Sequence, residues 1–296
     1  MKAEDLLQGA YDIHIHCGPD LIPRKQDVVD LAKAAHEAGM AGILVKDHTT
    51  STVGRVHAVN RMMAGKTRLF SCIALNPPVG SLNPTAVEAA LREGADLVYF
   101  PTYGARNHIA IWGAGKPPTA FPLPGEGFQG LSILDDQGQL KPECETILDM
   151  IAAFDAVLAT GHLSPEESLL LLAAAGKQGV KRMVVNHASM QVTDMTVDQQ
   201  REAADLGGFL EHSFFAVTKS CPGTIPLEKI RDQVLQVGVE HCIISTDFGQ
   251  AANPAPVDGF KIYLEELRKL GLTDDELRVM VVDNPAKLLE NRKVKS

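Results

Sequence analysis

Two histidines separated by a single residue, His14 and His16, close the first apolar run of this chain. Alternate side chains of a β-strand lie on the same face, so the two imidazoles should point the same way, a few ångströms apart. Imidazole nitrogen is a common metal ligand, and two such groups held side by side suit one divalent ion. This spacing predicts a metal site at the carboxyl end of the first strand.

Further titratable side chains follow other apolar runs along the chain. They comprise Lys46, Asp47, His48, His162, His187, Glu211, His212 and Asp247. Taken singly, a histidine at a strand end is usually a hydrogen-bonded structural residue, and an aspartate there usually caps the next helix. If the runs are the parallel strands of one closed barrel, however, their carboxyl ends converge on one mouth. The set as a whole therefore indicates a common site.

The alternation of apolar runs with amphipathic stretches predicts the elements that position these residues. Strands are expected near 10–16, 41–47, 68–75, 95–101, 155–161, 181–186, 207–213 and 240–246, each followed by a helical stretch. The run at 42–45 is apolar throughout, as in parallel strands buried on both faces. Eight alternations predict an α/β fold, a (β/α)8 TIM barrel, as one domain over residues 1–296. An open doubly wound sheet is the alternative, but no Gly-rich phosphate loop follows the first strand.

A long connection rich in Gly and Pro, residues 104–142, interrupts the alternation after the fourth strand. It should lie on the side of the barrel to which the carboxyl ends of the strands point. Long loops in compact domains are commonly either functional or disordered. We expect this insertion to act as a lid over the site, with an ordinary surface loop as the alternative.

Composition narrows the classes of partner. Hydrophobic residues make up 45% of the 296 residues and charged residues 22%, which is ordinary for a globular protein. The net charge of −9 argues against nucleic acid as a partner, and no apolar segment is long enough to span a membrane. The five cysteines form no CxxC pattern, and no secretory signal is visible. We therefore expect a cytoplasmic protein with a small-molecule substrate, and homo-oligomerisation remains open.

The residues at the predicted strand ends resemble those of the amidohydrolase superfamily, which are metal-dependent hydrolases on a TIM barrel. That family has HxH on strand one, histidines on strands five and six, and aspartate on strand eight; here these are His14, His16, His162, His187 and Asp247. The resemblance implies a divalent ion, zinc in the first instance, bound by His14, His16, His162 and Asp247. It also implies that Asp247 acts as general base and that His187 is a catalytic group.

Two departures from known patterns leave alternatives open. Binuclear amidohydrolases carry a bridging lysine or a glutamate at the end of strand four, and neither is in place within residues 96–102. One ion is therefore expected, with two ions bridged by Lys46 as the alternative. The HxH pair and the Lys46-Asp-His48 sequence also resemble the polymerase-and-histidinol-phosphatase phosphoesterases. Their last motif is Asp-x-His, whereas Gly249 stands at the histidine position here.

The resemblance implies a hydrolase that attacks a C–N or C–O bond with metal-activated water. Cationic and imidazole side chains near the predicted mouth favour a small anionic substrate. The candidate substrate-binding residues are Arg24, Lys46, His48, Arg106 and His108. Metal-dependent decarboxylation on the same scaffold, a phosphoesterase, and a binding protein with a relic metal site are the competing functions.

Overall fold

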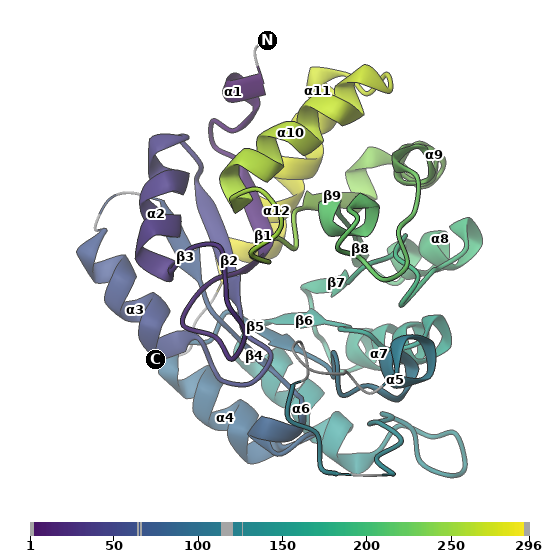
Figure 1. The fold of residues 1–296 in the computed structure, drawn as a ribbon. Coiled ribbons are helices and arrows are strands. Elements are labelled where there is room, and N and C mark those ends of the chain that lie inside the picture. Colours follow the sequence, from purple (N-terminus) through teal and green to yellow (C-terminus); the bar gives the residue numbers. More distant parts are fainter. Residues whose placement is uncertain (1–2, 64, 66, 114–120, 126, 293–296) are drawn as a thin grey trace.

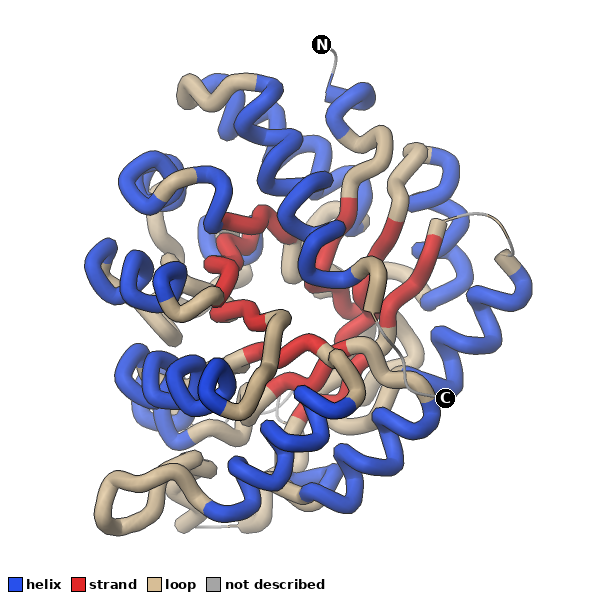
Figure 2. The backbone as a smooth tube through the Cα atoms, turned by 180° about the vertical axis from the view of Figure 1, so that it is seen from behind, coloured by secondary structure: helices blue, strands red, loops and turns tan. Residues whose placement is uncertain are grey.

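The protein is described from a computed structural model, which covers residues 3–63, 65, 67–113, 121–125 and 127–292. It confirms the predicted α/β barrel, because the strands form a central ring and the helices surround it (Figure 1, Figure 2). The strands are β1 Tyr11–His16, β2 Gly42–Lys46, β3 Arg68–Phe70, β4 Cys72–Ala74, β5 Leu97–Tyr99, β6 Val157–Ala159, β7 Met183–Val185, β8 Gly208–Ser213 and β9 Cys242–Ser245. All neighbouring strands pair in parallel.

Hydrogen bonding divides the ring into two sheets, with strand orders β1-β2-β3 and β4-β5-β6-β7-β8-β9. The run predicted as one strand at 68–75 is thus two short strands, separated at Ser71. The amide and hydroxyl groups of Ser71 both donate to Asp96 Oδ2, at 2.8 and 3.1 Å, which interrupts the backbone ladder.

The ring of strands is closed between the first and last strands of the chain. His16 N donates to Phe248 O, and Asp247 N donates to His14 O, both at 2.8 Å. These two bonds join β1 to the segment that follows β9. Residues more than 230 positions apart are therefore direct neighbours, as barrel closure requires.

Strand β1 contains an irregularity that determines where its histidines point. The register against β2 shifts between Asp12 and Ile15. Ile13 packs in the hydrophobic cluster inside the barrel, whereas Ile15 packs in the outer cluster between strands and helices. In a regular strand these two side chains would share a face. Such bulges commonly redirect a side chain near a functional site, and here the shift leaves both His14 and His16 facing inward.

The longer helices follow the strands and cover the outside of the barrel (Figure 2). They are α2 Val28–Glu37, α3 Val53–Met62, α4 Pro84–Glu93, α6 Pro142–Ala153, α7 Pro165–Lys177, α8 Val197–Asp205, α9 Leu227–Val237 and α10 Pro256–Lys269. Shorter helices are α1 Ala3–Leu6, α5 Arg106–Trp112, α11 Asp274–Arg278 and α12 Asn284–Leu289. Among the helices of the described residues, none has the length and apolar character needed to cross a membrane.

The predicted lid at 104–142 is only partly covered by the structure. Helix α5 opens it, and residues 114–120 and 126 lie outside the described residues. Its described parts contribute His108, Trp112 and Phe121 to the wall of the central pocket. The insertion therefore borders the site where the strands end, which agrees with its predicted position.

Candidate metal centre

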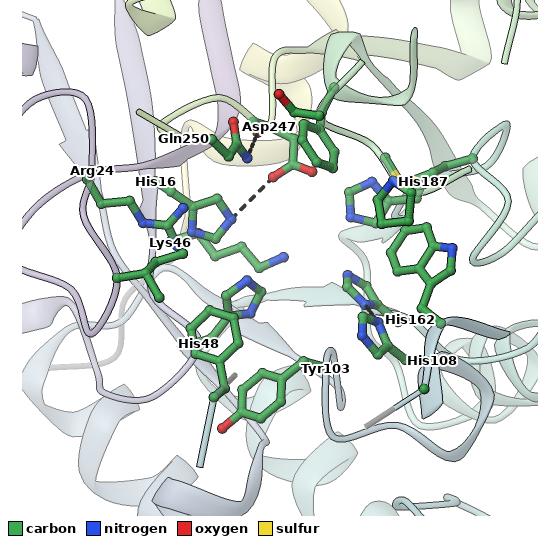
Figure 3. A pocket seen from close by; sticks show the side chains of 18 residues that line it. His16, Arg24, Lys46, His48, Tyr103, His108, His162, His187, Asp247 and Gln250 are labelled. Carbon is green, nitrogen blue, oxygen red and sulfur yellow. Dashed lines mark hydrogen bonds and ion pairs between the residues drawn. The ribbon is translucent and has the colours of Figure 1, made fainter. Parts of the chain in front are cut away.

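A pocket of about 770 Å³ opens at the carboxyl ends of the strands. This volume lies within the range of small-molecule sites, which is about 300–1,000 Å³. Figure 3 shows its side chains converging on one space from strands and loops around the barrel. Its imidazole, carboxylate and cationic lining comprises His16, Arg24, Lys46, His48, His108, His162, His187 and Asp247.

Three potential metal ligands meet at one side of this pocket. The Oδ1 atom of Asp247 lies 3.2 Å from His14 Nε2 and 3.2 Å from His16 Nε2. Ligand atoms bound at about 2.1 Å to one ion, at tetrahedral or octahedral angles, are separated by about 3.0–3.4 Å. Both distances from Asp247 Oδ1 therefore match the spacing of ligands around one ion, and the three ligand atoms lie within 4.8 Å of one another. All three residues are buried.

Glu211 on β8 orients His14 from behind. Its Oε1 accepts from His14 Nδ1 and from Ser245 Oγ, both at 2.6 Å, and its Oε2 accepts from Asn186 Nδ2 at 2.7 Å. Burial acts to raise the pKa of Glu211, but the nearby imidazoles and these hydrogen bonds hold it well below its usual range. An ionised carboxylate only accepts hydrogen bonds, so His14 Nδ1 carries the proton and its Nε2 presents a lone pair. Metal-binding histidines typically have such a carboxylate partner.

A nitrogen and a carboxylate oxygen face each other at this point. His14 Nε2 and Asp247 Oδ1 are 3.2 Å apart, which is the spacing of two ligands of one ion. The cationic Lys46 Nζ lies 2.9 Å from the same Nε2, and His16 Nδ1 has no hydrogen-bond partner among the described residues. A cation bound by His14 Nε2, His16 Nε2 and Asp247 Oδ1 would pair these three ligand atoms and take the place of Lys46 Nζ at His14. The nitrogen and oxygen donors fit zinc or another first-row divalent ion.

A second group of donors overlaps the first. Ligand atoms of His14, His187 and Glu211 lie within 4.8 Å of one another. An ion there would have to displace the hydrogen bond between His14 Nδ1 and Glu211. An ion bound by His14, His16 and Asp247 would leave the hydrogen bond between His14 Nδ1 and Glu211 intact.

The structure does not bring His162 to the predicted ligand group. It lies across the pocket from Asp247 (Figure 3), and its ring centre is 5.0 Å from that of His187. Its Nδ1 is 2.7 Å from Nδ1 of His108, with which it shares one hydrogen. The cause is the turn after β6: Gly161 has φ +66° and packs so closely on Phe100 O that a Cβ would lie 2.3 Å away. This turn sends His162 to the side of the pocket formed by the insertion.

Two of the predicted catalytic residues adopt backbone angles that are uncommon outside glycine. His187 has φ +58° and Asp247 has φ +52°. Residues held in this left-handed region cost about 1–3 kcal/mol each, and they cluster at functional sites. Both side chains line the pocket, and the ring of His187 lies 5.0 Å from that of His14. His187 thus borders the ligand group.

The predicted substrate-binding residues divide into two sets. Lys46, His48 and His108 line the pocket, whereas Arg106 is exposed and is not part of the lining. Arg106 and His108 are two positions apart in α5, which places them about 200° apart around the helix axis. They cannot both face the pocket. Arg24, from the loop after β1, does line it.

A hydrogen-bond relay that the sequence did not reveal sets the tautomer of His48. Asn76 Oδ1 accepts from the amides of Thr102 and Gly104, at 3.0 and 3.1 Å, which fixes its Nδ2 as a donor to Thr102 Oγ1 at 2.6 Å. Thr102 then donates its own hydrogen to His48 Nδ1 at 2.9 Å. Burial lowers the pKa of His48 well below its usual value, so the ring is neutral and Nε2 carries its hydrogen. The only signal in the sequence was the place of Asn76 and Thr102 directly after predicted strands.

Comparisons with known proteins agree with this description. A family model described as a family of unknown function, DUF6282, matches residues 9–211. No curated protein matches the sequence in this comparison. Among solved structures, an amidohydrolase from Pseudomonas aeruginosa has a TM-score of 0.65 at 14% identity, with 98% of this chain and 99% of that chain covered. A lactonase from Listeria monocytogenes has a TM-score of 0.60 at 13% identity, with 99% and 97% covered.

A third solved structure is a 2,6-dihydroxybenzoate decarboxylase in complex with 2,6-dihydroxybenzoate. Its TM-score is 0.55 at 11% identity, and 96% of this chain and 99% of that chain are covered. These TM-scores and coverages establish a shared fold along nearly the whole chain, and at such low identities they show the fold alone. The chain thus has the barrel fold of the amidohydrolases, and it belongs to the DUF6282 family.

Proposed function

We propose that this protein is a metal-dependent hydrolase that activates water against a C–N or C–O bond of a small molecule. The observation that carries the proposal is the meeting of His14 Nε2, His16 Nε2 and Asp247 Oδ1, with the two 3.2 Å contacts between them. Two imidazole nitrogens and a carboxylate oxygen converge there in a buried pocket, and together they form a donor set that suits a divalent ion. The amidohydrolase fold of the similar solved structures supports the same conclusion.

A divalent ion bound by these residues would polarise the substrate and lower the pKa of water to about 7. Asp247 lies at that point and can accept the proton of the attacking water. Burial raises the pKa of Asp247, which makes its carboxylate a stronger base, although His14 and Lys46 oppose the shift. The same side chain can return the proton to the leaving group.

His187 is placed to assist from beside the ligand group. Its Nδ1 lies 3.3 Å from Ser213 Oγ, and burial keeps its pKa well below the usual value, so the ring is neutral. A neutral imidazole that donates from its pocket-facing nitrogen can stabilise the oxyanion that develops on the substrate. His162 and His108 face this position from the far wall, where the substrate would be held.

We propose one ion rather than two, and zinc as the first choice. The two donor groups share His14, and Glu211 of the second group is already hydrogen-bonded to His14 Nδ1, so His187 is the only ligand that the second group adds without cost to this bond. The ring of Tyr99 lies on the inner face of β5, near the place where binuclear relatives carry a lysine or glutamate. Lys46 Nζ lies 4.5 Å above the centre of that ring and is hydrogen-bonded to His14 Nε2.

The alternatives are supported unequally. The decarboxylase among the similar structures keeps decarboxylation as the second candidate, since the same metal site can serve it. The phosphoesterase is disfavoured by Gly249, where its motif needs a histidine. A Cβ at Gly249 would lie 1.9 Å from His16 O, so no side chain fits there. The relic site is disfavoured because Asp247 Oδ1 lies at a ligand-to-ligand distance from both histidines.

The test is elemental analysis of the purified protein combined with a substrate panel. Amides, lactams, lactones and carboxylated aromatics are incubated with the chelated and the zinc-loaded protein. We expect about one ion per chain and hydrolysis that depends on it. Release of carbon dioxide would favour the decarboxylase, and turnover that survives complete chelation would rule out the proposal.

A further inference from the structure

One cation in the pocket wall is buried with most of its donors unused. Arg24 lies in the loop between β1 and α2, and its side chain is only 3% exposed. Its Nε donates to Asp20 Oδ2 at 2.7 Å. Within the described part of the chain, no group accepts a hydrogen bond from either Nη of Arg24. Arg24 lines the pocket, and its side chain reaches in beside His16 (Figure 3), so its unused Nη donors are available to a ligand there.

We propose that Arg24 binds a carboxylate group of the substrate, on the pocket wall beside His16. This inference rests on the proposed function, because it names the substrate class of the same site. The outer edge of a guanidinium is planar and presents two parallel N–H donors, which match the two oxygens of a carboxylate. Buried charges are normally paired and hydrogen-bonded, so the open edge of Arg24 calls for an acceptor of this kind.

The ion pair with Asp20 orients the guanidinium of Arg24 but uses only its Nε hydrogen. Asp20 takes only the Nε hydrogen, and its other oxygen accepts from Ile22 N at 3.4 Å. A salt bridge that served the loop alone would be better made with the paired donors of the guanidinium edge. Here Asp20 fixes the side chain and leaves that edge free.

The loop that carries Arg24 is tied to the segment that carries Asp247. Lys25 N donates to Gly249 O at 2.8 Å, and Arg24 forms an antiparallel bridge with Gln250. Gln250 in turn donates from Nε2 to the backbone oxygen of Asp247 at 2.8 Å. The arginine and the ligand aspartate are therefore held in one local framework. A substrate anchored by Arg24 would extend from there toward the metal ligands.

The remainder of the wall favours a flat apolar group attached to the carboxylate. Tyr103 and Phe121 stack with ring centres 4.6 Å apart, and both line the pocket with Trp112 and Phe215. Aromatic walls pack well against planar ligands. A single guanidinium edge suits a monoanion better than a phosphate dianion, which needs more donors. We therefore choose a planar carboxylate, such as benzoate, as the probe.

The experiment is isothermal titration of the full-length protein with benzoate, benzamide and inorganic phosphate. It is carried out on chelated protein and on zinc-loaded protein, so that binding through the ion is separated from binding through Arg24. Arg24→Gln removes the charge, and Arg24→Lys keeps it without the paired donors. Arg106→Gln is the matched control, because Arg106 is exposed and outside the pocket lining.

We expect chelated wild-type protein to bind benzoate at least about tenfold more tightly than benzamide. Loss of a charge-assisted pair should weaken benzoate about ten- to hundredfold in Arg24→Gln, and Arg24→Lys should fall between. Arg106→Gln should bind as the wild type does. Thermal unfolding of each variant verifies that the fold is retained, and the charge-retaining Arg24→Lys keeps the test valid if Arg24→Gln does not fold.

Several outcomes would overturn the assignment. These are equal benzoate affinity in wild type and folded Arg24→Gln, benzamide binding as tightly as benzoate, phosphate binding more tightly than benzoate, or no benzoate binding at all. Benzoate that binds only to zinc-loaded protein would also overturn it while leaving the hydrolase proposal intact. Conversely, an absence of metal or turnover would remove the proposed function without altering the result for Arg24.

Discussion

Replacement of Glu211 by glutamine tests how the metal ligands are held. The carboxylate is fully buried and accepts hydrogens from His14 Nδ1, Ser245 Oγ and Asn186 Nδ2. A glutamine has the same shape but only one acceptor oxygen. If that oxygen serves His14 and Ser245, its NH2 group faces the NH2 of Asn186, which cannot turn because Asn186 Oδ1 accepts from Gly161 N at 2.9 Å.

The expected magnitude follows from the hydrogen bond that is weakened. A hydrogen bond to a charged group contributes about 1.5–3 kcal/mol, and loss of a histidine's carboxylate partner typically weakens metal binding about 10–100-fold. The two ranges agree, since about 1.4 kcal/mol is tenfold. We therefore expect Glu211→Gln to bind zinc about 10–100-fold more weakly than the wild type.

The assay is competition for zinc against a fluorescent chelator of known affinity. Asp12→Asn is the matched control, because Asp12 is an equally buried carboxylate that accepts from His14 N at 3.2 Å and Thr246 Oγ1 at 2.6 Å but does not touch the imidazole. Its zinc affinity should stay within a few-fold of the wild type. A Glu211→Gln protein that folds and binds zinc as tightly as the wild type would refute the role given to Glu211.

Three further predictions concern other parts of the structure. Asp247→Asn and His162→Ala should both abolish turnover, but only Asp247→Asn should lose most of its zinc. Equal loss of zinc in the two variants would show that His162 is also a metal ligand. Lys46→Met should keep one ion per chain and bind it more tightly, because the ammonium no longer competes for His14 Nε2; loss of the ion would instead identify Lys46 as a ligand. The buried Nε2 of His212 has no hydrogen-bond partner among the described residues, and burial lowers the pKa of His212 to about 4. Because this pKa lies below the unfolded value of about 6.5, stability should fall as the pH drops from about 6.5 to about 4. In denaturant melts, His212→Asn should show a weaker fall over that range, and an unchanged pH dependence would contradict the reasoning.

Much of the fold could be predicted because its signals are local. Apolar runs alternate with amphipathic stretches along the chain, and helix starts carry local signals such as the Ser164–Glu167 capping box at the start of α7. The break at Ser71 could not be predicted, since it depends on hydrogen bonds to Asp96, 25 positions away. The irregularity in β1 could not be predicted from the sequence either. Strict alternation also places His14 and His16 on one face, so the pattern shows no trace of the shift.

Some features of the candidate site could likewise be predicted from the sequence, and others could not. The general rule that barrel strands end at one mouth was enough to predict that His14, His16 and Asp247 lie close together. His162 departed from the family pattern because the local turn at Gly161 decides where its side chain points. Arg106 lies outside the pocket lining, because proximity along the chain does not decide which face of α5 a residue occupies. The roles of Glu211, Asn76 and Thr102 depend on long-range hydrogen bonds that no local pattern records.

The proposed function depends on a catalytic divalent ion bound by His14, His16 and Asp247. Anomalous X-ray diffraction at the zinc edge, from crystals grown with zinc and without chelators, would locate that ion. We predict one strong peak in the pocket, about 2.0–2.2 Å from His14 Nε2, His16 Nε2 and an Asp247 oxygen, with Lys46 Nζ moved away from His14. A pocket without such a peak, with Lys46 still bonded to His14 Nε2, would contradict the account.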